Sequence, residues 1–223
     1  MISQRLLTLV LITLIGVAGM PQMAQAQTAD GPTFWLQFDE AAGATTFVDS
    51  SGNQNATCTG AACPTAGAVG RIGQAVQFDG VDDRISANLN APTGAYTLAA
   101  WVNGTDWNDW RTVFEFGDDA PWFGVTSGGS LALYPVIFGG TIPAGTWTHV
   151  AYTWTGTENR LYVNGTAVAT NQAPPPGNGQ GVVLGFEINS ISPWSGLLDD
   201  ARVYNRALTA GQIQELARPE EGP

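Results

Sequence analysis

The feature that most constrains this chain is its division, after residue 30, into short segments that suit β-strands. Gly, Asn, Asp and Pro separate these segments, and apolar residues alternate with polar ones inside them. Alternation with period two is typical of a half-buried strand, and those four residue types favour turns. The absence of any helical pattern between the segments predicts an all-β antiparallel sandwich or barrel. The candidate strands are 33–39, 74–80, 84–87, 95–104, 111–117, 122–126, 131–136, 147–156, 159–165, 166–170, 181–185 and 195–205.

Two local motifs sharpen this prediction. The dipeptide Asn164-Gly165 in "YVNGTAV" provides the positive φ angles of a two-residue type I′ hairpin. Near the end of the chain, Thr209 followed three residues later by Gln212 forms a capping box before "IQELA". We therefore expect one short C-terminal helix in an otherwise all-β domain.

The first 26 residues have the layout of a secretory signal peptide. One positive charge, an apolar run from Leu6 to Met20 and the small-residue site "AQA" at 24–26 follow one another. A membrane anchor is the alternative, but the run is short for a span and no cysteine follows the site for a lipid anchor. We expect a secreted protein, extracellular or periplasmic, with a single domain over 27–223 that ends in a short acidic tail.

Charge and cysteine content limit the partners and the compartment. All eight basic residues are arginines, against 19 acidic residues, and the formal net charge is −11. Such a charge repels nucleic acid and anionic lipid, and no other segment is apolar enough to span a bilayer. The two cysteines, Cys58 and Cys63, predict a disulfide in an oxidising compartment. A metal site is the alternative, but it would need further Cys or His, and the chain has one His.

Several motifs occur in the order of a known family. They run from "FDE" through "GRIGQAVQFDGVDDRI" and "GTWTHVAYTWTGTENRLYVNGTAV" to "SGLLDDARVYNRAL". Over about residues 34–217 the chain resembles a bacterial laminin G-like domain of the concanavalin A-like lectin and glucanase group. The resemblance implies a jelly roll of two antiparallel sheets in which the first and last strands pair. It also implies a binding module for carbohydrates, proteins or surfaces, often with a structural calcium ion.

The segment "FDEAAGATTFVDSSGNQN" offers oxygen ligands for calcium. Calcium prefers six to eight oxygens from carboxylates, amides and backbone carbonyls. Candidate ligands here are Asp39, Glu40, Asp49 and Asn53 around a Gly-containing turn. The alternative is that Asp49 and Asn53 are ordinary turn residues.

The adjacent pair Asp199-Asp200 would lie beside "FDE" if the first and last strands pair. Neighbouring acids repel, and a divalent cation would remove that cost. We expect Asp199 on the side of Leu197, Ala201 and Val203, needing either an ion or backbone N–H donors. Asp200 should face outward, and the alternative to calcium is that it pairs with Arg202 or Arg206.

The stretch "FDGVDD" at 78–83 is another set of possible calcium donors. The alternative, which we favour, is a turn in which Asp82 accepts backbone N–H bonds.

Aromatic residues indicate a possible carbohydrate site. Trp107, Asp109 and Trp110 share the connection "NGTDWNDWRTV", and Trp122 lies at a strand edge. Sugar rings stack on aromatic faces while their hydroxyls bond to acids and amides. The alternative is that Trp107 and Trp110 fold back as lids over the edge of the sandwich. Strand tryptophans such as Trp101, and Trp194, are expected to pack.

An enzymatic role has less support. The glucanase pattern Glu-x-Asp-x-x-Glu is absent, and the nearest text is "FEFGDDAPW" with Glu115, Asp118 and Asp119 at a turn. His149 is the only histidine and has no motif partner, so we expect it to be structural.

We therefore predict a secreted, non-enzymatic binding module for a polysaccharide or cell-surface polymer. The alternatives are a structural or adhesive envelope protein that self-associates or binds protein, and a glycan-active hydrolase.

Overall fold

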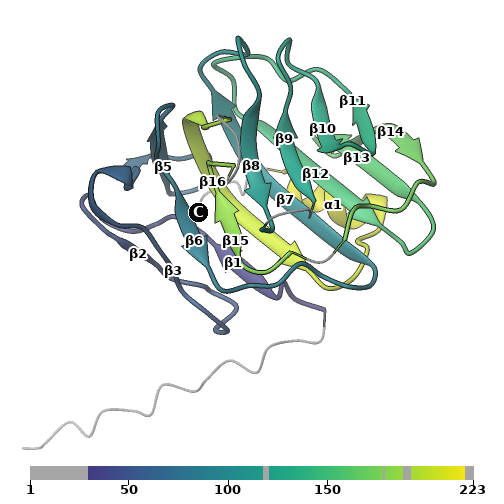
Figure 1. Cartoon of the computed structure of the whole chain (residues 1–223), viewed down its shortest axis with the longest axis horizontal. Helices are drawn as coiled ribbons and strands as arrows, with labels where there is room; N and C mark the ends of the chain where they lie inside the picture. The colour runs from purple at the N-terminus through teal and green to yellow at the C-terminus, as the bar shows by residue number, and fades with distance from the viewer. Residues whose placement is uncertain (1–29, 118–120, 178, 188–191, 219–223) are drawn as a thin grey trace, which may run out of the picture.

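The protein is a sandwich of two antiparallel sheets, as the sequence predicts (Figure 1). The computed structural model describes residues 30–117, 121–177, 179–187 and 192–218. The predicted signal peptide and the acidic end beyond Arg218 lie outside the described residues. No helix in the described ranges has the length and apolar character needed to cross a membrane.

Sheet A contains eight strands in the order β14-β13-β12-β7-β16-β5-β4, with β1 also paired to β16. The bounds are β1 Phe34–Leu36, β4 Thr65–Val69, β5 Gln74–Asp79, β7 Tyr96–Gly104, β12 Thr148–Trp154, β13 Asn159–Val163, β14 Thr166–Asn171 and β16 Ser195–Tyr204. The pairing of the first and last strands is confirmed, with Phe34 opposite Val203 and Leu36 opposite Ala201.

Sheet B contains eight strands in the order β11-β10-β9-β8-β15-β6-β3-β2. The bounds are β2 Thr46–Phe47, β3 Ala56–Thr57, β6 Ile85–Ala87, β8 Arg111–Glu115, β9 Trp122–Val125, β10 Leu131–Tyr134, β11 Ile137–Gly139 and β15 Val182–Leu184. At one side of the sandwich β11 of sheet B approaches β14 of sheet A (Figure 1).

The hydrophobic core fills the space between the sheets. Alternate residues of each strand point inward, so that Leu98 and Val150 of sheet A join Phe123 and Leu131 of sheet B in one fully buried cluster. Each such side chain contributes roughly 1.5–3 kcal/mol through removal of apolar surface from water. The outer face of each sheet, opposite the core, contacts α1 (Ala210–Leu216), loops or solvent.

Four strands escape sequence-based prediction: β2, β3, β4 and β11. The first two contain two residues each and β11 three, which is too few for a periodic pattern. The sequence of β4, "TAGAV", is dominated by Gly and Ala, which have low strand propensity. Pairing with β5 holds β4 in the sheet, so tertiary context overrides local preference.

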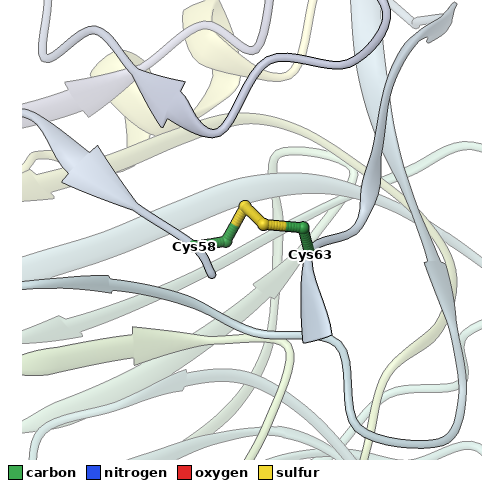
Figure 2. Close-up of a disulfide and its surroundings, with 2 residues drawn as sticks. All are labelled: Cys58 and Cys63. Atoms are coloured by element: carbon green, nitrogen blue, oxygen red, sulfur yellow. A yellow bond between two sulfur atoms is a disulfide. The ribbon is translucent and has the colours of Figure 1, made fainter. Parts of the chain in front are cut away.

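The predicted disulfide between Cys58 and Cys63 is confirmed (Figure 2). Its Cα atoms are 5.0 Å apart. Cys58 follows β3 of sheet B and Cys63 precedes β4 of sheet A, with the short 3₁₀ helix η1 (Gly60–Ala62) between them. The bond therefore links the two sheets where the chain crosses from one to the other.

The two predicted local motifs are also confirmed. Asn164 and Gly165 have φ angles of 48° and 78°, as a type I′ turn requires, and join β13 to β14. Thr209 and Gln212 form the capping box of α1. The helix packs its buried Ile213 with Tyr204 and Tyr162 on the outer face of sheet A.

Candidate functional site

The solvent face of sheet B carries a row of aromatic side chains. In β9, Phe123 and Val125 enter the core, so Trp122 points to the opposite face. Tyr134 of β10 is paired directly with Trp122 and therefore shares its face. Phe138 of β11 is half-exposed on the same sheet and lies 6.3 Å from Tyr134 between ring centroids.

Trp110 completes this surface from the loop that precedes β8. Its ring centroid lies 5.2 Å from Trp122, 5.4 Å from Tyr134 and 6.4 Å from Phe138. We call these four residues the aromatic platform. Tyr134 and Phe138 are 50% and 46% exposed, whereas Trp122 is 5% exposed and supports the others from below. The Trp122 indole N–H donates to Thr112 Oγ1 at 2.8 Å, which orients its ring.

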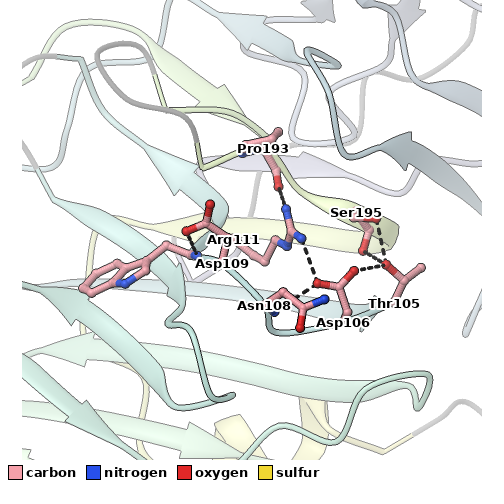
Figure 3. A network of polar contacts seen from close by, with 8 residues as sticks. Thr105, Asp106, Asn108, Asp109, Arg111, Pro193 and Ser195 are labelled. Carbon is pink, nitrogen blue, oxygen red and sulfur yellow. Dashed lines mark hydrogen bonds and ion pairs between the residues drawn. The ribbon is translucent and has the colours of Figure 1, made fainter.

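A polar network holds the Trp110 loop in place (Figure 3). Arg111 donates to the Pro193 carbonyl at 3.0 Å and to Asp106 at 2.8 Å. The hydrogen bond from Arg111 holds the pKa of Asp106 below its usual range, so this pair stays ionised. Thr105 bonds to Ser195 at 2.7 Å between hydroxyls. The loop is thus tied at one end to Ser195 of β16 and at the other to Pro193, just before β16, which positions Trp110 over the sheet.

The structure separates the residues that the sequence grouped as a ligand site. Trp110 and Trp122 are together in the platform. Trp107 instead packs against Trp194 with ring centroids 5.8 Å apart, and its N–H donates to the Ile142 carbonyl at 2.7 Å. Trp107 therefore matches the lid interpretation, and Trp194 is fully buried as expected. Asp109 is exposed, and its carboxylate accepts the Trp110 backbone N–H at 2.8 Å.

Tyr134 and Phe138 were missed as site residues. In the sequence, Tyr134 lies in the candidate strand 131–136 and Phe138 follows that strand, so both look like ordinary strand or loop residues. Only the pairing of β9, β10 and β11 brings them beside Trp110. The signal that could have identified them is that aromatic residues at outward positions of neighbouring strands share one face. It was incomplete because β11 was not recognised as a strand.

A buried carboxylate lies beside the platform within sheet B. Glu115 of β8 is paired with Trp122, lies on the same face and is buried. Glu115 is the only acidic residue among the strands of sheet B. Asp118 and Asp119, the other acids considered for catalysis, lie outside the described residues.

The predicted calcium ligands do not form one centre. Asp49 is buried and its carboxylate is saturated by the backbone N–H groups of Trp35, Ser51, Asn53 and Gln54 and by the Ser51 hydroxyl. The Asn53 side chain uses its N–H group as a donor to the Thr33 carbonyl at 2.9 Å. Both residues therefore behave as turn residues, which was the alternative interpretation.

Asp39 and Glu40 are likewise engaged with backbone. Asp39 Oδ1 accepts the Gln74 N–H at 2.8 Å, and Glu40 Oε1 accepts the Val48 N–H at 2.8 Å. These bonds fix two loops. They also hold the two carboxylates on different backbone partners, Gln74 and Val48.

The predicted orientation of Asp199 holds for Leu197, which shares its face, and is wrong for Ala201 and Val203, which lie in the core. Asp199 is paired with Trp101, and Leu198 with Val102, so Asp199 lies on the outer face of sheet A and Leu198 in the core. A β-bulge follows Asp199 and contains Asp200 at φ 50°, which returns Ala201 and Val203 to the core. The extra residue breaks the period-two count on which the prediction depended.

Backbone donors satisfy one oxygen of Asp199. The N–H groups of Arg71 and Ile72 donate to Oδ2 at 2.7 and 2.8 Å, whereas Oδ1 is buried without a partner. Burial raises the pKa of Asp199 to about 7, the charges of Asp200 and Asp39 add to the rise, and the two N–H groups oppose it.

Asp200 pairs with Arg202, one of its two predicted partners. The guanidinium donates to Asp200 at 2.9 and 3.0 Å, and the Trp35 indole N–H donates to the same carboxylate at 2.6 Å. Asp39, Asp199 and Asp200 share a cavity of about 190 Å³ with these residues. Among the described residues, however, the only acids that bring three ligand oxygens within 4.8 Å are Asp79, Asp82 and Asp83.

In the turn formed by these three acids, the carboxylates that accept backbone N–H groups are not the one that the sequence predicted. Asp83 Oδ2 accepts the Asp79 N–H at 2.7 Å, and Asp79 Oδ1 accepts the Val81 N–H at 2.8 Å. The acceptors are thus Asp79 and Asp83 rather than Asp82, because these two carboxylates flank the turn and point back across it. The trio is engaged as a turn. The five predicted ligands as a set do not fit a calcium centre.

His149 lies in a structural setting. It is buried on the outer face of sheet A, 5.4 Å from the Trp101 ring. Burial, together with the charge of Arg202, lowers the pKa of His149 to about 3, so the imidazole is neutral at physiological pH.

Comparison with protein families supports the resemblance noted in the sequence. A laminin G model, described as the concanavalin A-like lectin/glucanases superfamily, matches residues 78–214, more than half of the chain. The chain belongs to the concanavalin A-like lectin/glucanases superfamily. The jelly-roll form expected of this superfamily agrees with the two sheets described above. A comparison with curated proteins found no match.

Solved structures resemble this superfamily member to different extents. Domain 4 of AbnA, a GH43 extracellular arabinanase from Geobacillus stearothermophilus, in complex with arabinotriose, is 26% identical with a TM-score of 0.66. That match covers 85% of this chain and 99% of the domain. The ligand-binding domain of Botulinum neurotoxin serotype D, in complex with N-acetylneuraminic acid, is 15% identical with a TM-score of 0.65, over 85% of this chain and 51% of that one.

Trypanosoma rangeli sialidase is 16% identical with a TM-score of 0.63, over 86% of this chain and 33% of that one. The chain thus spans the whole arabinanase domain but about half or a third of the other two. Those two likenesses establish the fold alone.

Proposed function

We propose that this protein is a carbohydrate-binding module that uses the aromatic platform on sheet B. The partner would be a polysaccharide or a cell-surface glycan. The observation that carries the proposal is the exposure of Tyr134 and Phe138 beside Trp110 on one sheet face. Clustered, rigid aromatic rings with polar tips are typical of binding surfaces, and sugar C–H faces stack on them.

The arabinanase domain adds support from outside the chain. It is similar to this protein over almost its whole length and was solved with arabinotriose. Because fold alone does not determine function, this likeness supports a glycan ligand without naming the sugar.

We propose further that the module is not an enzyme. Most glycosidases act with two carboxylates that flank the scissile bond, about 5–5.5 Å apart in retaining enzymes. Glu115 is the single acid on the strands of sheet B, and it is buried beside Trp122. One buried carboxylate supports a binding role better than acid and nucleophile chemistry.

We also propose that the protein is exported. The Cys58–Cys63 disulfide is the structural feature that supports this, because disulfides persist in oxidising compartments.

The test is binding of the purified domain to a panel of soluble polysaccharides that includes arabinan, measured by calorimetry. We expect Trp110→Ala and Phe138→Ala each to weaken binding by about tenfold, equivalent to about 1.4 kcal/mol. Val69→Ala is the control, since it truncates an exposed apolar side chain on β4 of sheet A. Unchanged melting temperatures would show that the variants remain folded.

Another result would favour the adhesive alternative. If a glycan array gives no signal while ultracentrifugation shows oligomers of the wild-type protein, the carbohydrate proposal is abandoned.

A further inference from the structure

We propose that the aromatic platform selects uncharged glycans and excludes glycans that carry carboxylate or sulfate groups. This inference rests on the proposed function and adds the chemical class of the ligand. It follows from the distribution of cations and acids around the platform.

The only basic residue in the strands of sheet B is Arg111, and its guanidinium is already committed. One nitrogen donates to Asp106 at 2.8 Å and another to the Pro193 carbonyl at 3.0 Å. The Arg111 side chain is 11% exposed. A ligand carboxylate would therefore have to displace Asp106, which would leave that acid without its partner and loosen the loop that carries Trp110.

Arg84 is the next candidate cation, and it lies in a part of sheet B that is distant from the aromatic platform. It precedes β6, which β15 and β8 separate from β9. With strands about 4.8 Å apart, three steps across the sheet exceed the screening length of about 8 Å at physiological salt. Arg84 also stacks on the Phe186 ring at 5.5 Å.

The remaining described arginines are on sheet A, its loops or the C-terminal helix. Four of them pair with acids: Arg160 with Glu158, Arg202 with Asp200, Arg206 with Asp30 and Arg218 with Glu215. Arg71 lies over the Trp101 ring. Residues 118–120 and 188–191, outside the described ranges, include no basic residue, and the chain has no lysine at all.

Acidic groups near the platform strengthen the selection. Exposed Asp109 precedes Trp110, and the chain has a formal net charge of −11. An anionic glycan would lose water on docking without gaining a cation, and it would meet repulsion from Asp109 and from the net negative charge of the chain. A neutral glycan meets neither penalty.

The experiment compares pairs of glycans in which one member carries an added anionic group. Lactose with sialyllactose, and a neutral galactan with its sulfated form, are titrated into the wild-type protein in low salt. We expect the neutral member to bind at least tenfold more tightly, and the difference to shrink as salt is raised.

A charge reversal tests the cause. Asp109→Lys places a cation beside Trp110 and should reduce the preference for the neutral glycan by several-fold. Glu215→Lys makes the same charge change on α1, on the outer face of the opposite sheet, and should leave the preference unchanged. Melting temperatures report whether both variants fold.

The outcomes separate the two proposals. Equal or tighter binding of the anionic members overturns the selectivity but leaves the carbohydrate function standing. Failure of every glycan, neutral or anionic, overturns the carbohydrate function and the selectivity with it.

Discussion

At the residue scale, two buried titratable groups on the outer face of sheet A have opposite effects on how stability changes with pH. Asp199 and His149 are both paired with Trp101 in neighbouring strands. Burial favours the neutral form of each group. For the acid the neutral form is protonated, and for the imidazole it is deprotonated. Both groups therefore make the free energy of unfolding depend on pH, with slopes of opposite sign.

The signs follow from the two pKa values. The pKa of Asp199 rises from 3.8 to about 7, so its contribution is fully present below pH 3.8 and is lost as pH rises through 7. The pKa of His149 falls from 6.5 to about 3, so its contribution is present above pH 6.5 and is lost as pH falls towards 3. Between about pH 4 and 6.5 the two slopes cancel.

Single variants should expose each slope. With Asp199→Asn, we expect the free energy of unfolding to increase with pH between 4 and 6.5, by up to about 1.4 kcal/mol per pH unit. With His149→Phe, which keeps an aromatic ring against Trp101, we expect it to decrease with pH over the same range. Urea denaturation at several pH values measures both. Parallel profiles for wild type and both variants would contradict the assignment.

At the scale of elements, the sheets are held together at the places where the chain crosses between them. The network of Arg111 and Asp106 ties the loop between β7 and β8 to β16. The disulfide ties the crossing from β3 to β4. Each of these contacts fixes a short connection between the two sheets.

The disulfide encloses a short loop, so its effect should be modest. Chain-entropy arguments for a closed loop of this length give a stabilisation of about 2 kcal/mol. We expect the double variant Cys58→Ala and Cys63→Ala to lose about that amount in urea unfolding and to keep its glycan affinity. The platform lies on β9 to β11 and the loop before β8, away from the crossing from β3 to β4. A loss of affinity as well would show that this crossing also shapes the platform.

At the scale of the whole molecule, backbone donors occupy the acids for which calcium had been expected. Four backbone N–H groups and the Ser51 hydroxyl saturate Asp49, and two backbone N–H groups bind Asp199. These hydrogen bonds are a physical substitute for the calcium ion that the sequence predicts.

A melting experiment decides between ion and backbone donors. Because the observed hydrogen bonds already occupy these acids, we expect excess EDTA to leave the melting temperature of the domain unchanged and added calcium to raise it by less than about 1 °C. A ligand at free concentration L stabilises the native state by RT ln(1 + L/Kd), which is small when binding is weak. A clear fall with EDTA would instead support the calcium prediction. It would direct attention to the cavity that Asp39, Asp199 and Asp200 share.

The fold was largely predictable because its signals are local or ordered along the chain. The Asn164-Gly165 turn, the Thr209 cap and the alternating strands depend on a few consecutive residues. The pairing of the first and last strands followed from the family resemblance and is confirmed. The Cys58–Cys63 bond followed from composition and compartment.

The candidate site was predictable only in part, because its members meet across strands. The sequence pointed to Trp110 and Trp122 but grouped them with Trp107, which is partly buried and packs against Trp194. Which tryptophan of one loop turns outward depends on the Arg111 network and on the ring of Trp122 below it.

By itself, therefore, the sequence determined the all-β class, the hairpin, the terminal helix, the disulfide and the acidic, lysine-free surface. Those properties depend on residue type, spacing along the chain and composition. Only the tertiary structure decided that Tyr134 and Phe138 join Trp110, and that Asp199 leaves the core at a bulge. Register and bulges set which side chains share a face, and a shift of one residue reverses that choice.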